Sequence, residues 1–363
     1  MLIVIGTILF QKNVEFLSRT NRLWIFFYIL YYCFGLLAVG ISGFESSILA
    51  TLIPVVYFVG FHFLLSNKNQ FKVFFKVITI SFVVSALSTI ILYKLNFNLH
   101  TGGVYHLDLD RASGLSGDAN SAALASIIAY VLFDKFFSTT NIYLRLLKII
   151  ILITIFYSLF ITFSTTGLFV FAIILFITNY KFFTGIRIIL LGAAIVVLYA
   201  GIFSLKSQTK DLDLSTAQIY KIDNIINLLT FNLEKVDNSG RGDLIENILP
   251  YLYKNPIIGN GVDFSVVMRG HNTYLGVWVD AGVITFLFFL FVLYYFFFKT
   301  FSLNLNLRFF AMSILIVLYI FMVSLQSVIN QPFLIVLFIF VGYMIDYNKL
   351  GKGHLDFLNK TES

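Results

Sequence analysis

Residues 273–298 read TYLGVWVDAGVITFLFFLFVLYYFFF and contain one charged side chain, Asp280. About 20 apolar residues in a helix cross the ~30 Å hydrocarbon core of a bilayer, so this run predicts a membrane-spanning helix. The whole chain has the same character: 59% of its 363 residues are hydrophobic, 12% are charged, and the mean hydropathy is +0.91. Soluble domains carry about 25% charged residues. The sequence therefore indicates an integral membrane protein, and its one cysteine, Cys33, leaves no disulfide framework.

Further apolar runs have lengths that suit, or nearly suit, a membrane span. With 273–298 they predict an all-α polytopic membrane protein with about 10 transmembrane helices. Residues 1–10 make about half a span, and either lie in the membrane interface or belong to a further span. The run at 166–179 is the shortest. The other predicted spans are 23–42, 47–65, 73–93, 119–133, 146–163, 166–179, 186–205, 309–327 and 332–347.

Lysine and arginine predict the orientation. Alternate connections carry 16 of the 25 basic residues, and the positive-inside rule places these connections in the cytoplasm. Both termini are then cytoplasmic. The predicted organisation is an N-terminal bundle of about seven spans (1–205), a large outer loop (206–271), a C-terminal bundle of about three spans (272–348) and a cytoplasmic tail (349–363). The basic residues are scattered over inner loops, which argues against nucleic-acid binding.

The large outer loop contains a helical pattern. In GRGDLIENILPYLYKNPIIGNGV (240–262), apolar residues recur at helical spacing, while acidic and amide residues occupy the other face. Pro250 should kink this helix, and Asn255-Pro256 should end it before the turn Gly259-Asn260-Gly261. We expect an amphipathic helix on the outer membrane surface.

Few residues of this chain are candidates for a catalytic or binding role. Ion-coupled carriers keep charged groups at mid-membrane. Here the charged residues inside the runs all lie toward one end of their run: Lys76, Lys148, Arg187, Asp280 and Asp346. Polar residues gather instead at the predicted outer interface. Each has a purely structural interpretation as a surface anchor, a solvated side chain or a helix cap. They are Arg111, Asp118, Asn120, Arg241, Arg269, His271 and Asn272.

Two other polar stretches have structural interpretations as well. Asp108-Leu109-Asp110, with His106 nearby, resembles a divalent-metal motif of some glycosyltransferases, but two acids at this spacing are common in polar loops. Residues 164–167, Ser-Thr-Thr-Gly, predict a tight turn between two spans.

Three motifs in order carry a family resemblance. The first motif has an arginine, two glycines and Asn120 at the start of a span, in RASGLSGDANSAALA (111–125). The second is the 240–262 stretch, in which an amphipathic helix and a Gly-x-Gly turn follow Arg241. The third has His-Asn, nine residues and a glycine, in HNTYLGVWVDAGVIT (271–285). The sequence resembles the O-antigen ligase/polymerase superfamily over about residues 100–300. That superfamily also includes protein O-oligosaccharyltransferases.

The resemblance implies a glycosyltransferase of the GT-C type that needs no metal or other cofactor. Its donor would be an oligosaccharide on undecaprenyl pyrophosphate at the outer face of a bacterial inner membrane. Arg111 and Arg241 match the arginines that engage the pyrophosphate, and His271 matches the catalytic histidine. Asn120 and Asn272 match supporting positions, and Arg269 is a nearby substrate-binding candidate without a clear motif match.

Elementary chemistry fits these roles. Guanidinium groups bind phosphate bidentately and keep their charge, and a neutral histidine can take a proton from an acceptor hydroxyl. We expect a repeat-unit polymerase, working beside membrane lipid with a chain-length regulator and a flippase as partners. An O-antigen ligase, a lipid-oligosaccharide flippase and a metal-dependent transferase using Asp108 and Asp110 remain alternatives.

Overall fold

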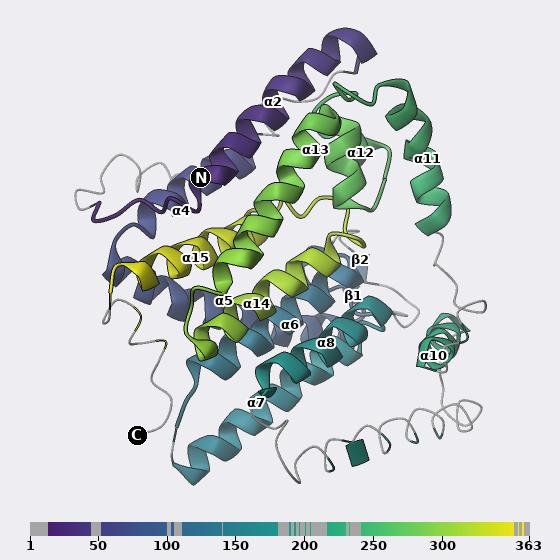
Figure 1. The fold of residues 1–363 in the computed structure, drawn as a ribbon. Helices are drawn as coiled ribbons and strands as arrows, with labels where there is room; N and C mark the ends of the chain where they lie inside the picture. The colour runs from purple at the N-terminus through teal and green to yellow at the C-terminus, as the bar shows by residue number, and fades with distance from the viewer. Residues whose placement is uncertain are drawn as a thin grey trace. The chain divides into compact units, whose positions relative to one another are not determined.

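The computed structural model describes residues 14–44, 52–99, 103–104, 111–139, 141–180, 189, 192–193, 196, 200, 204, 216–229, 232, 241–351, 355 and 358. Within these residues the chain is mostly helical (Figure 1). The described strands are β1 (Phe97–Asn98) and β2 (Gly103–Val104), which pair antiparallel. The sequence does not predict this small hairpin, because two residues per strand are too few for an alternating pattern.

Six described helices are long and apolar enough to cross a membrane: α2 (Arg22–Ser42), α5 (Lys68–Lys94), α6 (Ala119–Phe136), α7 (Ile142–Phe160), α13 (Thr273–Thr300) and α15 (Pro332–Lys349). Shorter apolar helices α4 (Ile53–Leu64), α8 (Thr165–Thr178) and α14 (Leu305–Phe321) coincide with other predicted spans. A helical multi-pass membrane protein is therefore confirmed. The count of about 10 spans stays a prediction, and the run at 186–205 lies largely outside the described residues.

The chain divides into two compact units. The first contains Met1–Ser81, Asp134–Arg145 and Arg241–Ser363, and the second contains Phe82–Phe133 and Leu146–Gly240.

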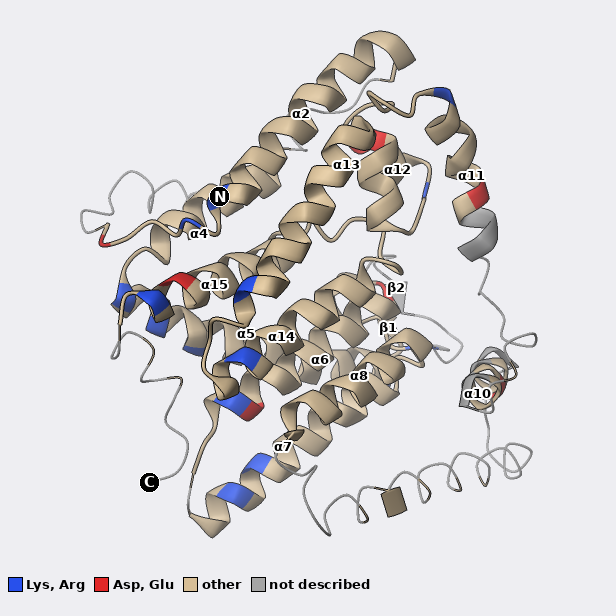
Figure 2. Cartoon of the chain, viewed as in Figure 1, with Lys and Arg blue, Asp and Glu red and all other residues tan. Residues whose placement is uncertain are grey.

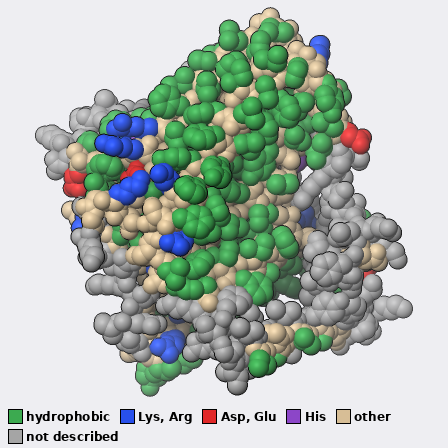
Figure 3. All heavy atoms as spheres, in the orientation of Figure 1, with side chains coloured by type: hydrophobic (Ala, Val, Ile, Leu, Met, Phe, Trp, Pro, Cys, Tyr) green, Lys and Arg blue, Asp and Glu red, His purple; other side chains and the backbone are tan. Residues whose placement is uncertain are grey.

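Aromatic side chains fill the core of the first unit, where α2 packs along α13 and α4 along α15. The Trp24 ring of α2 lies 6.2 Å from the rings of both Phe289 and Phe296 of α13, and 4.7 Å from that of Phe338 of α15. Offset and edge-on aromatic pairs of this kind add to the stabilisation that apolar contact provides. Hydrophobic side chains also cover the outer faces of α2 and α13 (Figure 3), as expected for helices in contact with lipid.

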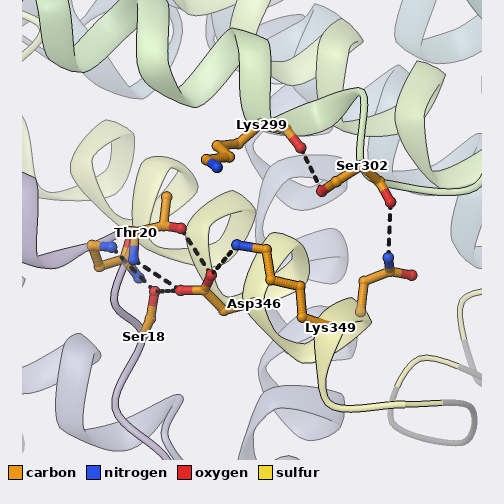
Figure 4. A network of polar contacts seen from close by, with 8 residues as sticks. Ser18, Thr20, Lys299, Ser302, Asp346 and Lys349 are labelled. Carbon is orange, nitrogen blue, oxygen red and sulfur yellow. Dashed lines mark hydrogen bonds and ion pairs between the residues drawn. The ribbon is translucent and has the colours of Figure 1, made fainter.

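One end of the first unit is basic (Figure 2). Asp346 near the end of α15 accepts hydrogen bonds from the hydroxyls of Ser18 (2.7 Å) and Thr20 (2.9 Å) and pairs with Lys349 (3.4 Å), as Figure 4 shows. Asn348 donates to the Ser302 carbonyl at 3.0 Å, which brings the α13–α14 turn to the same place. We call this the basic end. Its described lysines and arginines include Arg19, Arg22, Lys68, Lys299, Arg308 and Lys349.

The opposite end of the first unit gathers polar loops. The Ser42 hydroxyl at the end of α2 donates to the Asn260 carbonyl at 2.5 Å, and Thr273 at the start of α13 bonds to the α14–α15 connection. The helices thus run between a basic end and a loop end. Because the predicted cytoplasmic connections of this unit meet at the basic end, this arrangement fits the predicted orientation, which itself stays a prediction.

Small residues bring the helices of the second unit together. The Ser126 and Ser158 hydroxyls of α6 and α7 lie 2.9 Å apart. A Cβ on Gly167 of α8 would lie 2.8 Å from the Ala123 Cβ of α6, so α8 approaches α6 more closely than a larger residue would allow. Helix α10 (Thr216–Leu229), from the predicted outer loop, packs against α8.

Candidate functional site

The predicted catalytic histidine lies in a tight loop of the first unit. The tripeptide Arg269-Gly270-His271 joins the short helix α12 (Phe264–Val267) to α13. The backbone angle φ is 55° at Arg269 and 43° at His271, and 60° at Asp263 just before α12. Each such left-handed non-glycine residue costs about 1–3 kcal/mol and persists only where its surroundings enforce it. The loop is therefore held in an unfavourable shape by its neighbours.

The side chains in this loop differ in exposure. Arg269 is exposed and His271 is half-buried. Among the residues that the structure describes, the His271 imidazole makes no hydrogen bond, so both ring nitrogens can engage a substrate. The predicted substrate-binding candidate Arg269 is thus two residues from His271 in one loop, at the end of the unit opposite the basic end.

The residues after His271 anchor it to the rest of the unit. The Asn272 side chain accepts a hydrogen bond from the Leu275 N–H at 3.1 Å and so caps α13. Thr273 donates its N–H to the Met322 carbonyl (2.8 Å) and its hydroxyl to the Leu325 carbonyl (2.8 Å). Asn272 therefore has the capping role that the sequence analysis gave as its structural interpretation. Thr273 was missed, because its partners are about fifty residues away in the sequence.

Helix α11 (Arg241–Lys254) packs on the same loop. Its buried residues Ile248 and Leu252 join Phe264 and Val279 in one apolar cluster, and a Cβ on Gly270 would lie 2.9 Å from the Ile248 Cδ1. The helix begins at Arg241, as the motif predicts, but the Arg241 side chain lies outside the described residues. The sequence analysis expected the apolar face to lie on the membrane surface. In the structure this face packs against α12 and α13 through Ile248 and Leu252.

A break in α13 receives the predicted Gly-x-Gly turn. Gly282 has φ 79° and ψ 174°, which interrupts the helix and removes its regular hydrogen bonds. The N–H groups of Asn260 and Gly261 donate to the carbonyls of Val279 (2.8 Å) and Asp280 (3.0 Å), and the Val283 N–H donates to the Pro256 carbonyl (2.9 Å). The turn thus satisfies the backbone groups that the break exposes. This contact gives the Gly-x-Gly turn and Gly282 a shared structural role, and the sequence did not predict that they meet.

The second unit holds Arg111 and Asn120 against one turn. The Arg111 Nε donates to the Thr162 carbonyl at 2.9 Å, and Asn120 Oδ1 accepts from the Ser164 hydroxyl at 2.9 Å. Ser164 also caps α8 by accepting from the Gly167 N–H at 3.1 Å. The prediction of a turn at 164–167 is therefore wrong in its position: the turn is at 161–163, and 165–167 begin α8. Asp118 caps α6 through the Ser121 N–H at 2.8 Å.

The predicted site residues fall into two groups. The first unit brings Arg269, His271, Asn272 and helix α11 together, and the second unit brings Arg111 and Asn120 together. The alternative metal ligands His106, Asp108 and Asp110 lie outside the described residues.

Sequence reasoning missed an acid at the loop end. Asp263 accepts a hydrogen bond from the Asn330 amide, and burial raises the pKa of Asp263 to about 6. The left-handed backbone of Asp263 gives no signal in the sequence, because glycine usually occupies such positions.

These observations define a mostly helical, multi-pass membrane protein in which the loop that carries His271 packs against a helix broken at Gly282. Residues 150–290 match a family model described as O-antigen ligase, and this stretch runs from α7 through His271 and Gly282. The match supports the resemblance to the O-antigen ligase/polymerase superfamily that the sequence motifs indicated. This family indicates an enzyme that transfers glycosyl groups in polysaccharide synthesis from a lipid-linked oligosaccharide. No curated protein matches the chain.

Proposed function

We propose that the protein is a metal-independent polymerase of oligosaccharide repeat units carried on undecaprenyl pyrophosphate. It joins them into O-antigen, capsule or another surface polysaccharide. The reaction takes place at the outer face of the bacterial inner membrane, with both termini of the chain in the cytoplasm. The reacting groups are His271, Arg241 and Arg111, and Asn120, Asn272 and Arg269 support them.

The observation that carries this proposal is the geometry of the His271 loop. A half-buried imidazole without a described partner stands beside an exposed arginine, at the end of the unit opposite its basic end. Strained backbone concentrates at catalytic sites, where a side chain must be aimed before the substrate arrives. A histidine that served only as an interfacial residue would not need left-handed backbone on both sides of Gly270.

The chemistry assigned to the loop is a proton transfer coupled to glycosyl transfer. The hydroxyl oxygen of the acceptor sugar attacks the anomeric carbon of the donor, and the bond from that carbon to the pyrophosphate oxygen breaks. His271 takes the hydroxyl proton, and undecaprenyl pyrophosphate leaves with the electron pair of the broken bond. General base catalysis of this kind contributes about 10²–10⁴-fold in rate.

Arginines neutralise the leaving group in this proposal. Arg111 and Arg241 each offer a planar guanidinium that binds two phosphate oxygens and stays charged throughout the reaction. Asn120 supports Arg111 through the shared α7–α8 turn, where Arg111 contacts Thr162 and Asn120 contacts Ser164. A chain-length regulator and a flippase are the expected protein partners.

The decisive experiment compares wild-type protein and His271→Gln in lipid nanodiscs with lipid-linked repeat units as both donor and acceptor. The glutamine variant should fold and bind donor but lose polymer by about 10²–10⁴-fold. The matched control is His62→Gln, because His62 is a buried histidine of α4. The Tyr343 hydroxyl donates to the backbone carbonyl of His62, and the substitution keeps this carbonyl. Full-length polymer from His271→Gln would disprove the catalytic assignment.

An O-antigen ligase is the second candidate, because the matched family model carries that description. The two functions share a donor and differ in the acceptor. Supplying the same donor with either a second repeat unit or a lipid A core therefore separates them. Polymer growth only with the repeat unit supports the polymerase, and transfer only to the core supports the ligase.

A further inference from the structure

A buried acid lies next to the site without a part in the chemistry proposed above. Asp280 is 3% exposed and belongs to α13, just before the break at Gly282. Placing a carboxyl group inside a membrane helix is costly unless hydrogen-bond donors surround it, so an acid at such a position is a candidate for a functional role.

Every described partner of Asp280 donates a hydrogen bond to it. Oδ1 accepts from the Ser265 N–H at 2.6 Å, and Oδ2 accepts from the Ser265 hydroxyl at 3.1 Å and the Tyr31 hydroxyl at 2.7 Å. The Ser265 N–H can only donate, whereas the hydroxyls of Ser265 and Tyr31 can donate or accept; beside a carboxylate both hydroxyls act as donors. An asparagine would turn its NH₂ group toward at least one of them.

Ser265 connects Asp280 to the loop that carries His271. Its carbonyl accepts the Gly270 N–H at 3.0 Å, and Gly270 precedes His271. The Gln326 side chain donates to the same carbonyl at 3.2 Å. Ser265 is thus held on its N–H and hydroxyl side by Asp280, and its carbonyl fixes the residue next to His271.

The geometry points to Asp280 as a positioning residue for His271, acting through Ser265, with Tyr31 holding the carboxyl group in place. This inference rests on the proposed function of His271. Asp280 contacts neither His271 nor the substrate; it keeps α12 and the left-handed loop in the shape that aims the imidazole. Displacing a catalytic group by about 1 Å costs roughly 10²-fold in rate.

Two substitutions test this link from different sides. Asp280→Asn keeps the size of the side chain and replaces one acceptor with a donor. Tyr31→Phe removes one hydroxyl from α2, which donates to Asp280 and also accepts the Asp263 N–H at 3.3 Å, and it leaves Ser265 and the loop sequence intact. Tyr347→Phe is the matched control, because it also removes a buried hydroxyl bonded at 2.8 Å, here to the Leu65 carbonyl at the basic end.

The variants are measured in nanodiscs by kcat, by KM for the lipid-linked donor, and by hydrogen exchange of residues 264–272. We expect Asp280→Asn to lower kcat about tenfold or more with KM within about twofold, and to speed exchange in 264–272. Tyr31→Phe should act in the same direction with a smaller effect, and Tyr347→Phe should leave kcat and this exchange unchanged. A general loss of structure would instead raise exchange across the whole unit.

Two outcomes separate this inference from the proposed function. Wild-type kcat and wild-type exchange in both Asp280→Asn and Tyr31→Phe would overturn the positioning role, even if His271→Gln is inactive. A fully active His271→Gln would overturn the proposed function, and the catalytic part of this inference with it. If Asp280→Asn does not fold, wild-type kcat and wild-type exchange in Tyr31→Phe would be enough to overturn the positioning role.

Discussion

Substituting Gly282 with alanine should destabilise the protein strongly. An alanine Cβ would lie 1.9 Å from the Ile257 carbonyl oxygen and 2.4 Å from its carbonyl carbon. Both are backbone atoms, so no side-chain rotation can relieve the overlap. The φ of 79° adds about 1–2 kcal/mol of strain for a residue with a Cβ.

The overlap must also cost hydrogen bonds. Moving the 255–261 turn away from α13 breaks contacts such as Val283 N–H to the Pro256 carbonyl (2.9 Å) and Asn260 N–H to the Val279 carbonyl (2.8 Å). A buried backbone group left without a partner costs about 1–3 kcal/mol. Strain and one broken contact together give a loss of about 2–5 kcal/mol.

Apparent melting temperature in detergent, at one scan rate, measures this effect. Gly40→Ala is the control, because it makes the same change in α2 where an added Cβ meets nothing within 4 Å. Alanine is favoured over glycine inside a helix by up to about 1 kcal/mol, so this control should keep or slightly raise the melting temperature. A Gly282→Ala protein as stable as wild type would refute the account of the break.

Further outcomes follow from the other contacts. Asp263→Asn should raise the melting temperature more at pH 8 than at about pH 4: burial raises the Asp263 pKa from 3.8 to about 6, so the folded state loses stability as pH rises from the lower to the higher of these values. Asn272→Ala should cost about 1 kcal/mol of stability through the lost α13 cap, which thermal unfolding measures. Arg111→Ala should lower the polymerisation rate roughly a hundredfold, and lysine should restore only part of it. Chelation with EDTA should leave the polymerisation rate unchanged, and Asp108→Ala combined with Asp110→Ala should lower it only mildly.

The sequence predicted the helices well, because lipid demands long apolar runs with few alternatives. It also predicted α11 from its periodicity, with a start at Arg241, and it placed helix starts at Asn120 and Asn272. These features depend on neighbours in the sequence. A hydrophobic run or a capping side chain acts within a few residues, so its pattern is legible without the fold.

The arrangement of the site was less accessible from the sequence. The contacts of Thr273 with Met322 and Leu325, and of Asp280 with Tyr31, join segments that are distant in the chain. Periodicity carries no information about such partners. The left-handed backbone at Arg269 and His271 was equally hidden, because few non-glycine residues adopt that conformation, so residue type alone does not predict it.

The break in α13 has a consequence for how the protein is assembled. A helix entering lipid with an open kink would expose unpaired carbonyl and N–H groups to hydrocarbon, where no solvent can satisfy them. In this protein the groups that fill the kink come from residues 255–261, which a ribosome makes before α13. The turn is therefore already outside the ribosome when its partner helix emerges. The two segments are expected to enter the membrane together. Extra residues placed between them would leave the backbone groups at the break without partners, and the loop that carries His271 would then not form.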